Sequence, residues 1–303
     1  MKIGLDIMSG DNAPLSNING AINYINNPLS RNNTIILYGN ENIIKNNKAL
    51  IKKHPNRIST SITSHIINMN DSPSIAFKTK RNSSMIKIID DLNDNHVDAA
   101  VSSGNTGALL ASSLLILGKI KGIRRPALAP YIPIGKKGFV LCDAGANTDI
   151  KPEHLLQFAY MSSAYIEHLG KINNPKIGLL NIGIEENKGN TLIKNTYKLL
   201  ESNFKNFKGN IESRSLLDSK VDIVICDGFT GNIVLKLIEG TINSMINITK
   251  KSINSHSLSK IVKPVLYTVF DDLKKSFDYE EYGGTPLLGV NGIVTKCHGS
   301  SND

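Results

Sequence analysis

The sequence predicts a three-layer α/β/α sandwich built on a mainly parallel sheet. Two observations carry this prediction. Short runs of apolar and β-branched residues recur along the chain, and a helical pattern follows each of them. Each run also ends in a polar loop rich in Gly, Asn and Asp. Strands that alternate with helices in this way pair in parallel and are covered on both faces.

The expected elements follow one another in a regular order. Strands are predicted over residues 2–7, 34–38, 97–102, 139–142, 177–181 and 221–226, because each run is bounded by turn-forming residues. Helical patterns are predicted to end near residues 25, 53, 117, 169 and 200, and a last one follows residue 232.

Residues 240–282 break this rhythm, since they contain no clear strand and have a helical pattern that Pro264 interrupts. Their apolar cluster is flanked by lysines, which makes a basic amphipathic arm. Such an arm can lie on a membrane, dock a partner or pack against a second subunit. We expect residues 1–303 to form one catalytic domain that includes the arm.

Composition and charge narrow the functional classes. Among 303 residues, 35 Lys and Arg face 26 Asp and Glu, so the formal charge is +9 and favours acidic partners. Nucleic acid is not expected, because the chain has no Trp, only 6% aromatic residues and no basic cluster. No apolar run is long enough for a membrane span, and the first strand reaches Asp6 too early for a signal peptide. The expected location is therefore cytoplasmic.

The three cysteines predict no disulfide framework and no CxxC metal or redox pair. Cys142 and Cys226 each end an apolar run, directly before an aspartate. We expect both to be small buried core residues.

Five polar loops follow the expected strands: SGD, SSGNTG, DAGAN, NIGIEENKGN and DGFTGN. The carboxyl ends of parallel strands meet at one edge of a sheet, where ligands bind. Gly and Asn tolerate left-handed backbone, and Gly lets backbone N–H groups approach a ligand closely. A helix that begins directly after such a loop adds unpaired N–H donors. The pattern predicts a phosphate or oxyanion site at this edge.

Common catalytic motifs are missing from the chain. It contains no GxGxxG, GxxxxGK[ST], HExxH or GxSxG, and its histidines have no metal-ligand spacing. Basic residues do stand close to the polar loops, namely Lys80, Arg81, Arg124, Lys151 and Lys188. This combination favours phosphoryl or acyl transfer with inorganic phosphate, driven by positioning and charge stabilisation.

The segments MKIGLDIMSGDNAP, KTKRNSSM, VSSGNTGALL, DAGANTDIKPEHLLQFA, LLNIGIEENKGN, CDGFTGNIVLKLIEG, EYGGTPLLGVNG and HGSSN occur in this order. They resemble the bacterial phosphate acyltransferases (PlsX family) over essentially the whole chain. The resemblance implies reversible transfer of a fatty acyl group from acyl-acyl-carrier-protein to inorganic phosphate, which gives acyl phosphate for phospholipid synthesis.

The same resemblance implies partners and a fold. It implies an acidic acyl carrier protein, a homodimer, peripheral membrane contact and a downstream glycerol-3-phosphate acyltransferase, with no organic cofactor and no metal. It implies a fold similar to that of the phosphotransacetylases and the isocitrate and isopropylmalate dehydrogenases. Family members also continue past the position of Asp303 with a further helix that covers the end strand.

Within this resemblance, three groups of residues form the expected site. Phosphate and the developing oxyanion are expected at Ser103, Gly104, Asn105, Thr106, Gly107 and Arg124. The candidate catalytic residues are Lys151, Asn147, Asp143, Asp227 and His298. Other substrate contacts are expected from Asp6, Gly10, Asp11, Lys80, Arg81, Asn181, Glu185, Lys188 and Asn232.

Two alternatives remain open at this point. The chain could be another enzyme on the same fold, either a phosphotransacetylase-like enzyme that uses acyl-CoA or a metal- and NAD-dependent dehydrogenase. In the second case Asp143, Glu185, Glu186 and Asp227 would bind Mg²⁺. It could also be a non-catalytic relative that docks a carrier protein or a membrane.

Overall fold

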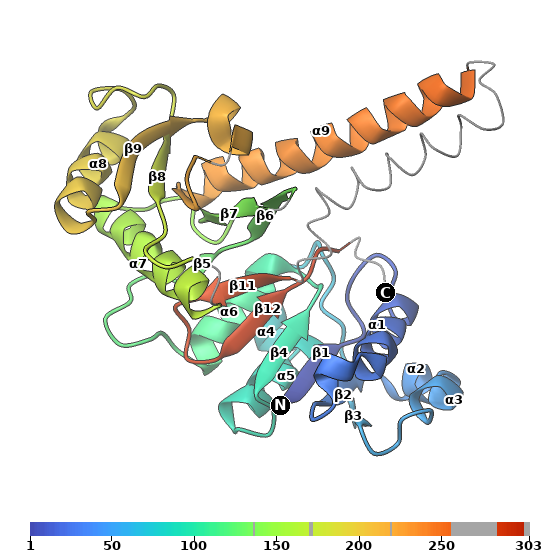
Figure 1. Cartoon of the computed structure of the whole chain (residues 1–303). Helices are drawn as coiled ribbons and strands as arrows, with labels where there is room; N and C mark the ends of the chain where they lie inside the picture. Colours follow the sequence, from blue (N-terminus) through green and yellow to red (C-terminus); the bar gives the residue numbers. More distant parts are fainter. Residues whose placement is uncertain (136, 170–171, 219, 256–283, 300–303) are drawn as a thin grey trace. The chain divides into compact units, whose positions relative to one another are not determined.

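The computed structural model describes residues 1–135, 137–169, 172–218, 220–255 and 284–299 (Figure 1). The chain divides into two compact units. Unit 1 comprises Met1–Pro126 and Gly284–Asp303, and unit 2 comprises Ala127–Gly283. The sequence was expected to form a single catalytic domain, and that expectation stays a prediction.

The sheet of unit 1 is mainly parallel. Its strands run in the order β3 (Ile58–Ile62), β2 (Thr34–Gly39), β1 (Lys2–Asp6), β4 (Ala99–Ser102), β12 (Ile293–Lys296) and β11 (Thr285–Leu288). The pairs from β3 to β12 are parallel, and β11 pairs antiparallel with β12. Three strands with carboxyl ends at one edge therefore lie side by side as β1, β4 and β12.

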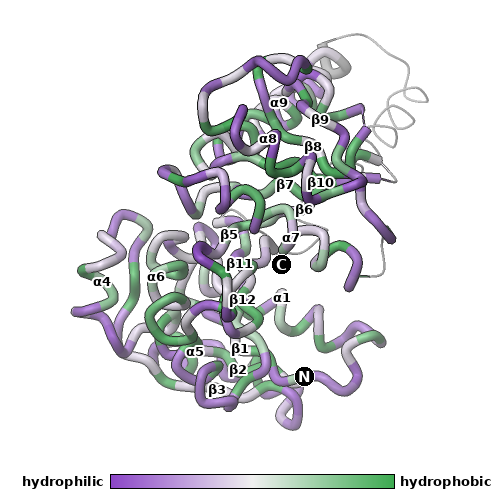
Figure 2. The backbone as a smooth tube through the Cα atoms, turned by 90° about the vertical axis from the view of Figure 1, so that its left-hand side faces the viewer, coloured by the Kyte–Doolittle hydropathy of each residue, from purple (hydrophilic) through white to green (hydrophobic). Residues whose placement is uncertain are grey.

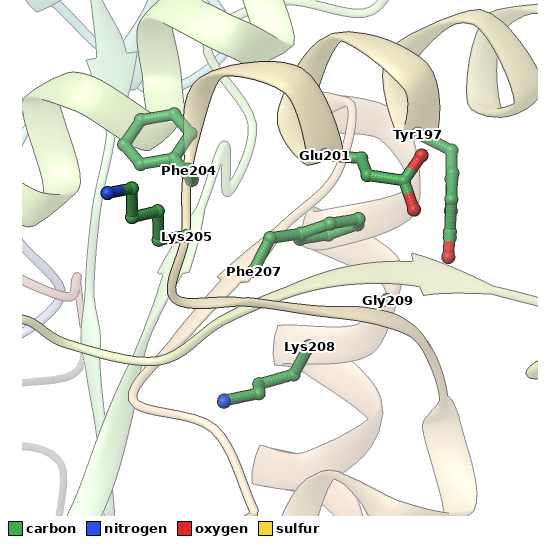
Figure 3. Close-up of a pocket in the computed structure, with 7 residues that line it drawn as sticks. All are labelled: Tyr197, Glu201, Phe204, Lys205, Phe207, Lys208 and Gly209. Carbon is green, nitrogen blue, oxygen red and sulfur yellow. The ribbon is translucent and has the colours of Figure 1, made fainter.

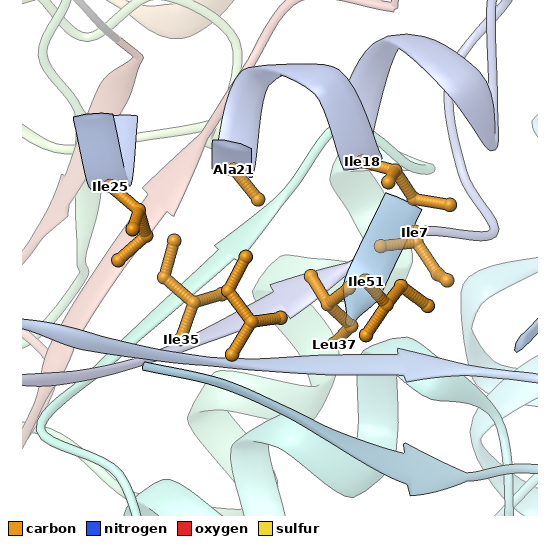
Figure 4. Close-up of a cluster of buried hydrophobic side chains, with 8 residues drawn as sticks. Ile7, Ile18, Ala21, Ile25, Ile35, Leu37 and Ile51 are labelled. Carbon is orange, nitrogen blue, oxygen red and sulfur yellow. The ribbon is translucent and has the colours of Figure 1, made fainter. Parts of the chain in front are cut away.

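Helices cover both faces of this sheet. They are α1 (Leu15–Asn26), α2 (Glu41–Asn46), α3 (Lys48–Ile51), α4 (Pro73–Thr79), α5 (Ser84–Asn93) and α6 (Thr106–Ile116), with a short 3-10 turn over Pro28–Ser30. Alternate residues of a strand point to opposite faces. Ile35 and Leu37 of β2 join Ile18 and Ala21 of α1 in one buried cluster (Figure 4). Tyr38, on the opposite face, reaches α5, where its hydroxyl contacts Asp91.

Unit 2 contains a second sheet, in the order β6 (Tyr131–Ile134), β7 (Lys137–Cys142), β10 (Ile223–Ile225), β8 (Ile177–Asn181) and β9 (Phe207–Glu212). The strands β7, β10, β8 and β9 are parallel, and β6 is antiparallel to β7. Figure 2 shows the hydrophobic residues that run along β7, β8 and β10. The remaining elements are β5 (Ala127–Leu128), α7 (Pro152–His168), α8 (Thr191–Asn203), α9 (Gly228–Ser255) and a 3-10 turn over Ser213–Asp218.

The predicted α/β class with a mainly parallel sheet is confirmed, although the strands form two sheets rather than one. The strand at 177–181 has the predicted bounds, and the helix after SSGNTG begins at Thr106 rather than at residue 108. Sequence patterns missed β3, β5, β6, β9, β11 and β12, because these strands are short or carry polar residues, as in KGNIE of β9. Residues 240–255 of the expected arm lie in α9, and residues 256–282 fall outside the described residues. Within the described part of the chain, no helix is long and apolar enough to span a membrane.

Candidate functional site

The start of α6 in unit 1 offers two backbone donors. Asn105 is the N-cap of this helix, and its Oδ1 accepts a hydrogen bond from the amide of Ala108 at 3.0 Å. The amides of Thr106 and Gly107, the first two helical residues, have no intrahelical partner. In the described part of the chain nothing else accepts from them. They form the positive end of an eleven-residue helix, which is a suitable receptor for an anion.

The side chain of Asn105 is fully used in shaping this loop. Besides capping α6, its Nδ2 donates to the carbonyls of Met69 at 2.8 Å, Asp71 at 3.0 Å and Asn68 at 3.4 Å. Asn105 is also buried. It therefore ties residues 68–71 to the start of α6, so its amide is a positioning group there.

Two cations predicted to bind substrate have partners within unit 1. The Nζ of Lys80 contacts the Asp71 carboxylate at 2.5 Å and donates to the carbonyl of Ile66 at 2.8 Å. Arg81 pairs with Asp90 at 3.2 Å, and its guanidinium lies 4.6 Å from the centre of the Phe77 ring. Lys80 thus holds the same 68–71 loop as Asn105, and Arg81 braces α5 against α4.

The loops after β1 and β4 are joined by a buried network. Asp6 is fully buried and accepts hydrogen bonds from the Met8 amide at 3.0 Å and the Ser102 hydroxyl at 2.8 Å. Ser102 in turn accepts from the Gly104 amide at 3.1 Å, and the Ser103 hydroxyl donates to the Ser9 carbonyl at 2.5 Å. Asp6 and Ser103 therefore fix the two loops to each other.

Glycine is required at two predicted positions of this network. Gly10 has a φ of +108°, and a Cβ there would lie 2.7 Å from the Ser103 hydroxyl oxygen. A Cβ on Gly104 would lie 3.0 Å from the Cβ of Ser9 in the first loop, and 2.5 Å from the terminal methyl of Met85. Both glycines allow the close approach of the loops that surround the start of α6.

The end of β12 brings a further cation and the HGSSN segment to these loops. The amide of Asp11 donates to the carbonyl of Gly299 at 2.7 Å, which places His298 beside the first loop in the chain. The Nζ of Lys296 lies 3.4 Å from the carbonyl oxygen of Ser103. Lys296 was not among the predicted site residues, because it is placed by β12, a strand that the sequence patterns missed. Arg124 is exposed, and its carbonyl accepts from the Lys119 ammonium at 3.0 Å.

In unit 2 the DAGAN loop folds around its own aspartate. The fully buried Asp143 carboxylate accepts from the amides of Leu128, Ala146 and Asn147 at 3.0, 3.1 and 2.7 Å. It also accepts from the Asn147 side-chain amide at 2.9 Å. Burial raises the pKa of Asp143, and these donors oppose the increase. Asp143 and Asn147 are thus brought together in an arrangement that organises the loop.

The DGFTGN loop closes against the same group. The amide of Gly228 donates to the Asn147 carbonyl at 2.7 Å, and a Cβ on Gly231 would lie 1.9 Å from the Asp143 carbonyl oxygen. Asp227 accepts from the amide and hydroxyl of Thr230 at 2.9 and 2.6 Å, so its carboxylate caps the first turn of α9. Asn232 lies next to Gly145, where a Cβ would be 3.6 Å away from it.

The remaining predicted residues of unit 2 lie in two loops. Lys151 is exposed at the start of α7, and its amide donates to Nδ1 of the buried His154 at 3.1 Å. Asn181 donates from Nδ2 to the carbonyl of Lys188 at 3.2 Å, and Lys188 donates from its amide to the carbonyl of Glu185 at 3.1 Å. The side chains of Glu185 and Lys188 are exposed. His154 was not among the predicted residues; its side chain at the third helical position accepts from the N-cap amide of Lys151, as in a capping box, although the residue types are not the usual ones.

Within the described ranges, no three His, Cys, Asp or Glu residues lie close enough to hold a metal ion. Asp143, Glu185, Glu186 and Asp227, the acids that the dehydrogenase alternative requires, therefore form no metal-binding cluster among the described residues. Cys142 and Cys226 are buried on the neighbouring strand ends of β7 and β10, as their positions in apolar runs predicted.

Solved structures with a similar fold place the chain in a structural class. A phosphotransacetylase from Streptococcus pyogenes has a TM-score of 0.61 at 14% identity, over 99% of this chain and 89% of its own. A 4-hydroxythreonine-4-phosphate dehydrogenase from Klebsiella pneumoniae has a TM-score of 0.51 at 11% identity, over 97% of this chain and 88% of its own. The chain thus has the α/β fold shared by phosphotransacetylases and such dehydrogenases, as predicted.

Sequence comparison then gives the family. The pattern of the family described as "Fatty acid synthesis protein" matches residues 1–303. A protein named phosphate acyltransferase from Geobacillus sp. (strain WCH70) is 43% identical over 303 residues, which cover 100% of this chain and 90% of that protein. The chain belongs to this family of acyltransferases, and the resemblance seen in its motifs is confirmed.

Proposed function

We propose that this protein transfers a fatty acyl group, reversibly, from an acyl carrier protein to inorganic phosphate. The products are acyl phosphate, a precursor for phospholipid synthesis, and the free carrier protein. Family membership supports phosphate as the acceptor. The observation that carries the proposal is the pair of open amides at Thr106 and Gly107, at the positive end of α6.

In the proposed reaction these amides hold phosphate and orient one of its oxygens toward the thioester carbonyl carbon. The new C–O bond forms first, and the π electron pair of the carbonyl moves onto its oxygen. When this pair returns, the C–S bond breaks and its electron pair leaves with the sulfur as the carrier thiolate. Negative charge develops on the carbonyl oxygen before the thiolate departs. Lys296, whose Nζ lies 3.4 Å from the Ser103 carbonyl oxygen, is a cation close to the same loop.

The other predicted residues take proposed roles that fit their contacts. Asn105, Asp6 and Asp143 position backbone through the hydrogen bonds described above, and Asp227 caps α9. Lys151, exposed at the start of α7, is a proposed catalytic cation, as the family resemblance implies. His298 is the proposed histidine for proton transfer, since its segment adjoins the loop of Asp11.

The direct test is mass spectrometry of the purified protein with phosphate and either palmitoyl-acyl-carrier-protein or palmitoyl-CoA. We expect palmitoyl phosphate from the carrier substrate, only when phosphate is present. Product from palmitoyl-CoA alone would instead favour a phosphotransacetylase-like enzyme. Absence of product from both, in a protein shown to be folded, would contradict the proposal.

A homodimer forms part of the proposal and is supported by one side of α9. Large apolar side chains stand exposed there at helical spacing: Phe229, Ile233, Leu237, Met245 and Ile248, each more than half exposed. Contiguous exposed apolar surface is typical of a contact with another macromolecule. We assign this stripe to a second copy of the chain, which sedimentation of the variant Leu237→Gln/Met245→Gln would test. If the variant still forms dimers but no longer sediments with anionic vesicles, the stripe would be assigned to the membrane.

A further inference from the structure

Unit 2 has a surface groove that none of the functional residues discussed above lines. It lies between the second half of α8 and the start of β9 and has a volume of about 440 Å³. Figure 3 shows the residues that line it: Tyr197, Glu201, Phe204, Lys205, Phe207, Lys208 and Gly209. The groove therefore belongs to the edge of the second sheet, where β9 is the last strand.

The floor of the groove is aromatic. The rings of Tyr197 and Phe207 meet edge to face with centroids 5.2 Å apart, and Phe204 packs against Tyr160 at 4.5 Å. Burial raises the pKa of Tyr197, and the nearby carboxylates of Glu201 and Glu186 add to this effect. Tyr197 and Phe207 are only partly buried, so they offer rigid apolar surface to a partner.

The rim of the groove is basic. Lys205 and Lys208 are exposed, and in Figure 3 Lys208 extends from the side of the backbone opposite the Phe207 ring. Neither forms an ion pair within the ranges that the structure describes, unlike Lys45, Lys87 and Lys236 elsewhere. Glu201 is the one carboxylate among the lining residues, so two lysines stand against one acid there.

The backbone next to these lysines is irregular. The pairing of β8 with β9 shifts register between Ile177 and Leu179, and Gly209 has a φ of +85°. Such a bulge bends an edge strand and redirects its side chains. A second groove of about 310 Å³, lined partly by Lys176, Lys208 and Lys220, also includes the bulge. A lysine at a bulge can simply block strand-to-strand aggregation, but that role needs no aromatic floor.

We propose that this aromatic, lysine-rimmed groove docks the acyl carrier protein. The inference rests on the proposed function, which supplies an acidic protein as the acyl donor. Interfaces combine an apolar core, rich in Tyr and Phe, with a polar rim. A basic rim attracts an acidic partner, speeds the encounter and excludes partners of the wrong charge. The groove offers both components on unit 2, on residues that have no part in the proposed chemistry.

The test compares two double variants with the same change of charge. Lys205→Glu/Lys208→Glu reverses the rim, and Lys52→Glu/Lys53→Glu reverses two exposed lysines of unit 1 that form no ion pair in the described ranges. We expect the rim variant to raise KM for palmitoyl-acyl-carrier-protein by roughly tenfold and to weaken its dependence on salt. Its kcat and its KM for phosphate should match those of the wild type. The matched control should change KM by less than about twofold.

A binding measurement separates docking from turnover. Fluorescence anisotropy with labelled carrier protein that bears no acyl group should show the same loss of affinity in the rim variant alone. Equal KM values for the rim variant and the wild type would overturn the inference, and so would an equal increase in both double variants. A wild-type protein that makes no palmitoyl phosphate would overturn the proposed function instead, so the two failures are distinguishable.

Discussion

Two strand-end loops of this protein have similar sequences and opposite hydrogen-bonding. SSGNTG in unit 1 follows β4, and DAGAN in unit 2 follows β7; both are rich in small and polar residues. In unit 1 the amides of Thr106 and Gly107 have no acceptor within the described residues. In unit 2 the Asp143 carboxylate takes up three amides and the side chain of Asn147.

The position of the acid explains this difference. In unit 1 the buried carboxylate, Asp6, lies on the neighbouring strand and acts on the loop through the hydroxyl of Ser102. In unit 2 the acid stands inside the loop, directly after β7, so it satisfies the donors itself. A Gly- and Asn-rich loop thus keeps amides available for the proposed phosphate only where no internal carboxylate accepts from them.

The largest expected effect concerns the DAGAN loop, whose amides donate to its own aspartate, Asp143. Asp143→Ala removes the acceptor of four hydrogen bonds, three of them from backbone amides, so we expect a loss of about 3 to 5 kcal/mol in the free energy of unfolding. Urea unfolding followed by circular dichroism measures this. The exposed Asp149 of the same segment is the control, and Asp149→Ala should cost less than about 0.5 kcal/mol. Equal free energies of unfolding for the two variants would contradict the structural role assigned to Asp143.

The next effect tests the open amides. Thr106→Pro removes the first helical N–H and the hydroxyl, yet proline is well tolerated at the first position of a helix. Losing a hydrogen bond to a charged ligand should raise KM for phosphate roughly tenfold to hundredfold with little change in stability. Thr106→Ala keeps the amide and should stay close to the wild type. An unchanged KM in the proline variant would place phosphate elsewhere.

The sequence predicted these loops because glycine, asparagine and apolar runs determine the backbone conformation of their own segment. The strand at 177–181 and the capping of α6 by Asn105 follow from neighbours in the chain. Which donors stay open could not be predicted, because it depends on distant contacts. The side chain of Asn105 donates to carbonyls in the distant 68–71 loop. The ammonium of Lys80 is paired with the Asp71 carboxylate. Lys296 reaches Ser103 only because β12 pairs beside β4.

A smaller effect sharpens the contrast between buried acids. Asp91 of unit 1, unlike Asp143, has a cation, since Lys87 lies 2.8 Å and the Tyr38 hydroxyl 2.6 Å from its carboxylate. Burial alone would raise the pKa of Asp91, but the hydrogen bonds from Lys87 and Tyr38 outweigh it and lower the pKa. The folded protein therefore binds this proton more weakly than the unfolded chain does.

Stability from Asp91 is accordingly complete above the pKa of the unfolded chain, about 3.9, and is lost as the pH falls through the lower folded value. Asp91→Asn should cost about 1 to 2 kcal/mol at pH 7 and progressively less below about pH 4. Urea unfolding across this range measures the difference. A cost that stays constant with pH would mean that Asp91 acts through packing rather than charge.

The smallest expected effect concerns the two thiols beside Asp143. Cys142 and Cys226 are essentially inaccessible, and burial raises the pKa of both, with the charge of Asp143 adding to it. A thiol must ionise and reach its substrate to act as a nucleophile, and these two do neither. Cys142→Ala and Cys226→Ala should therefore leave kcat within about twofold of the wild type, at a stability cost of about 1 kcal/mol. Complete loss of turnover in a folded variant would contradict direct attack by phosphate and would require an acyl-enzyme in unit 2.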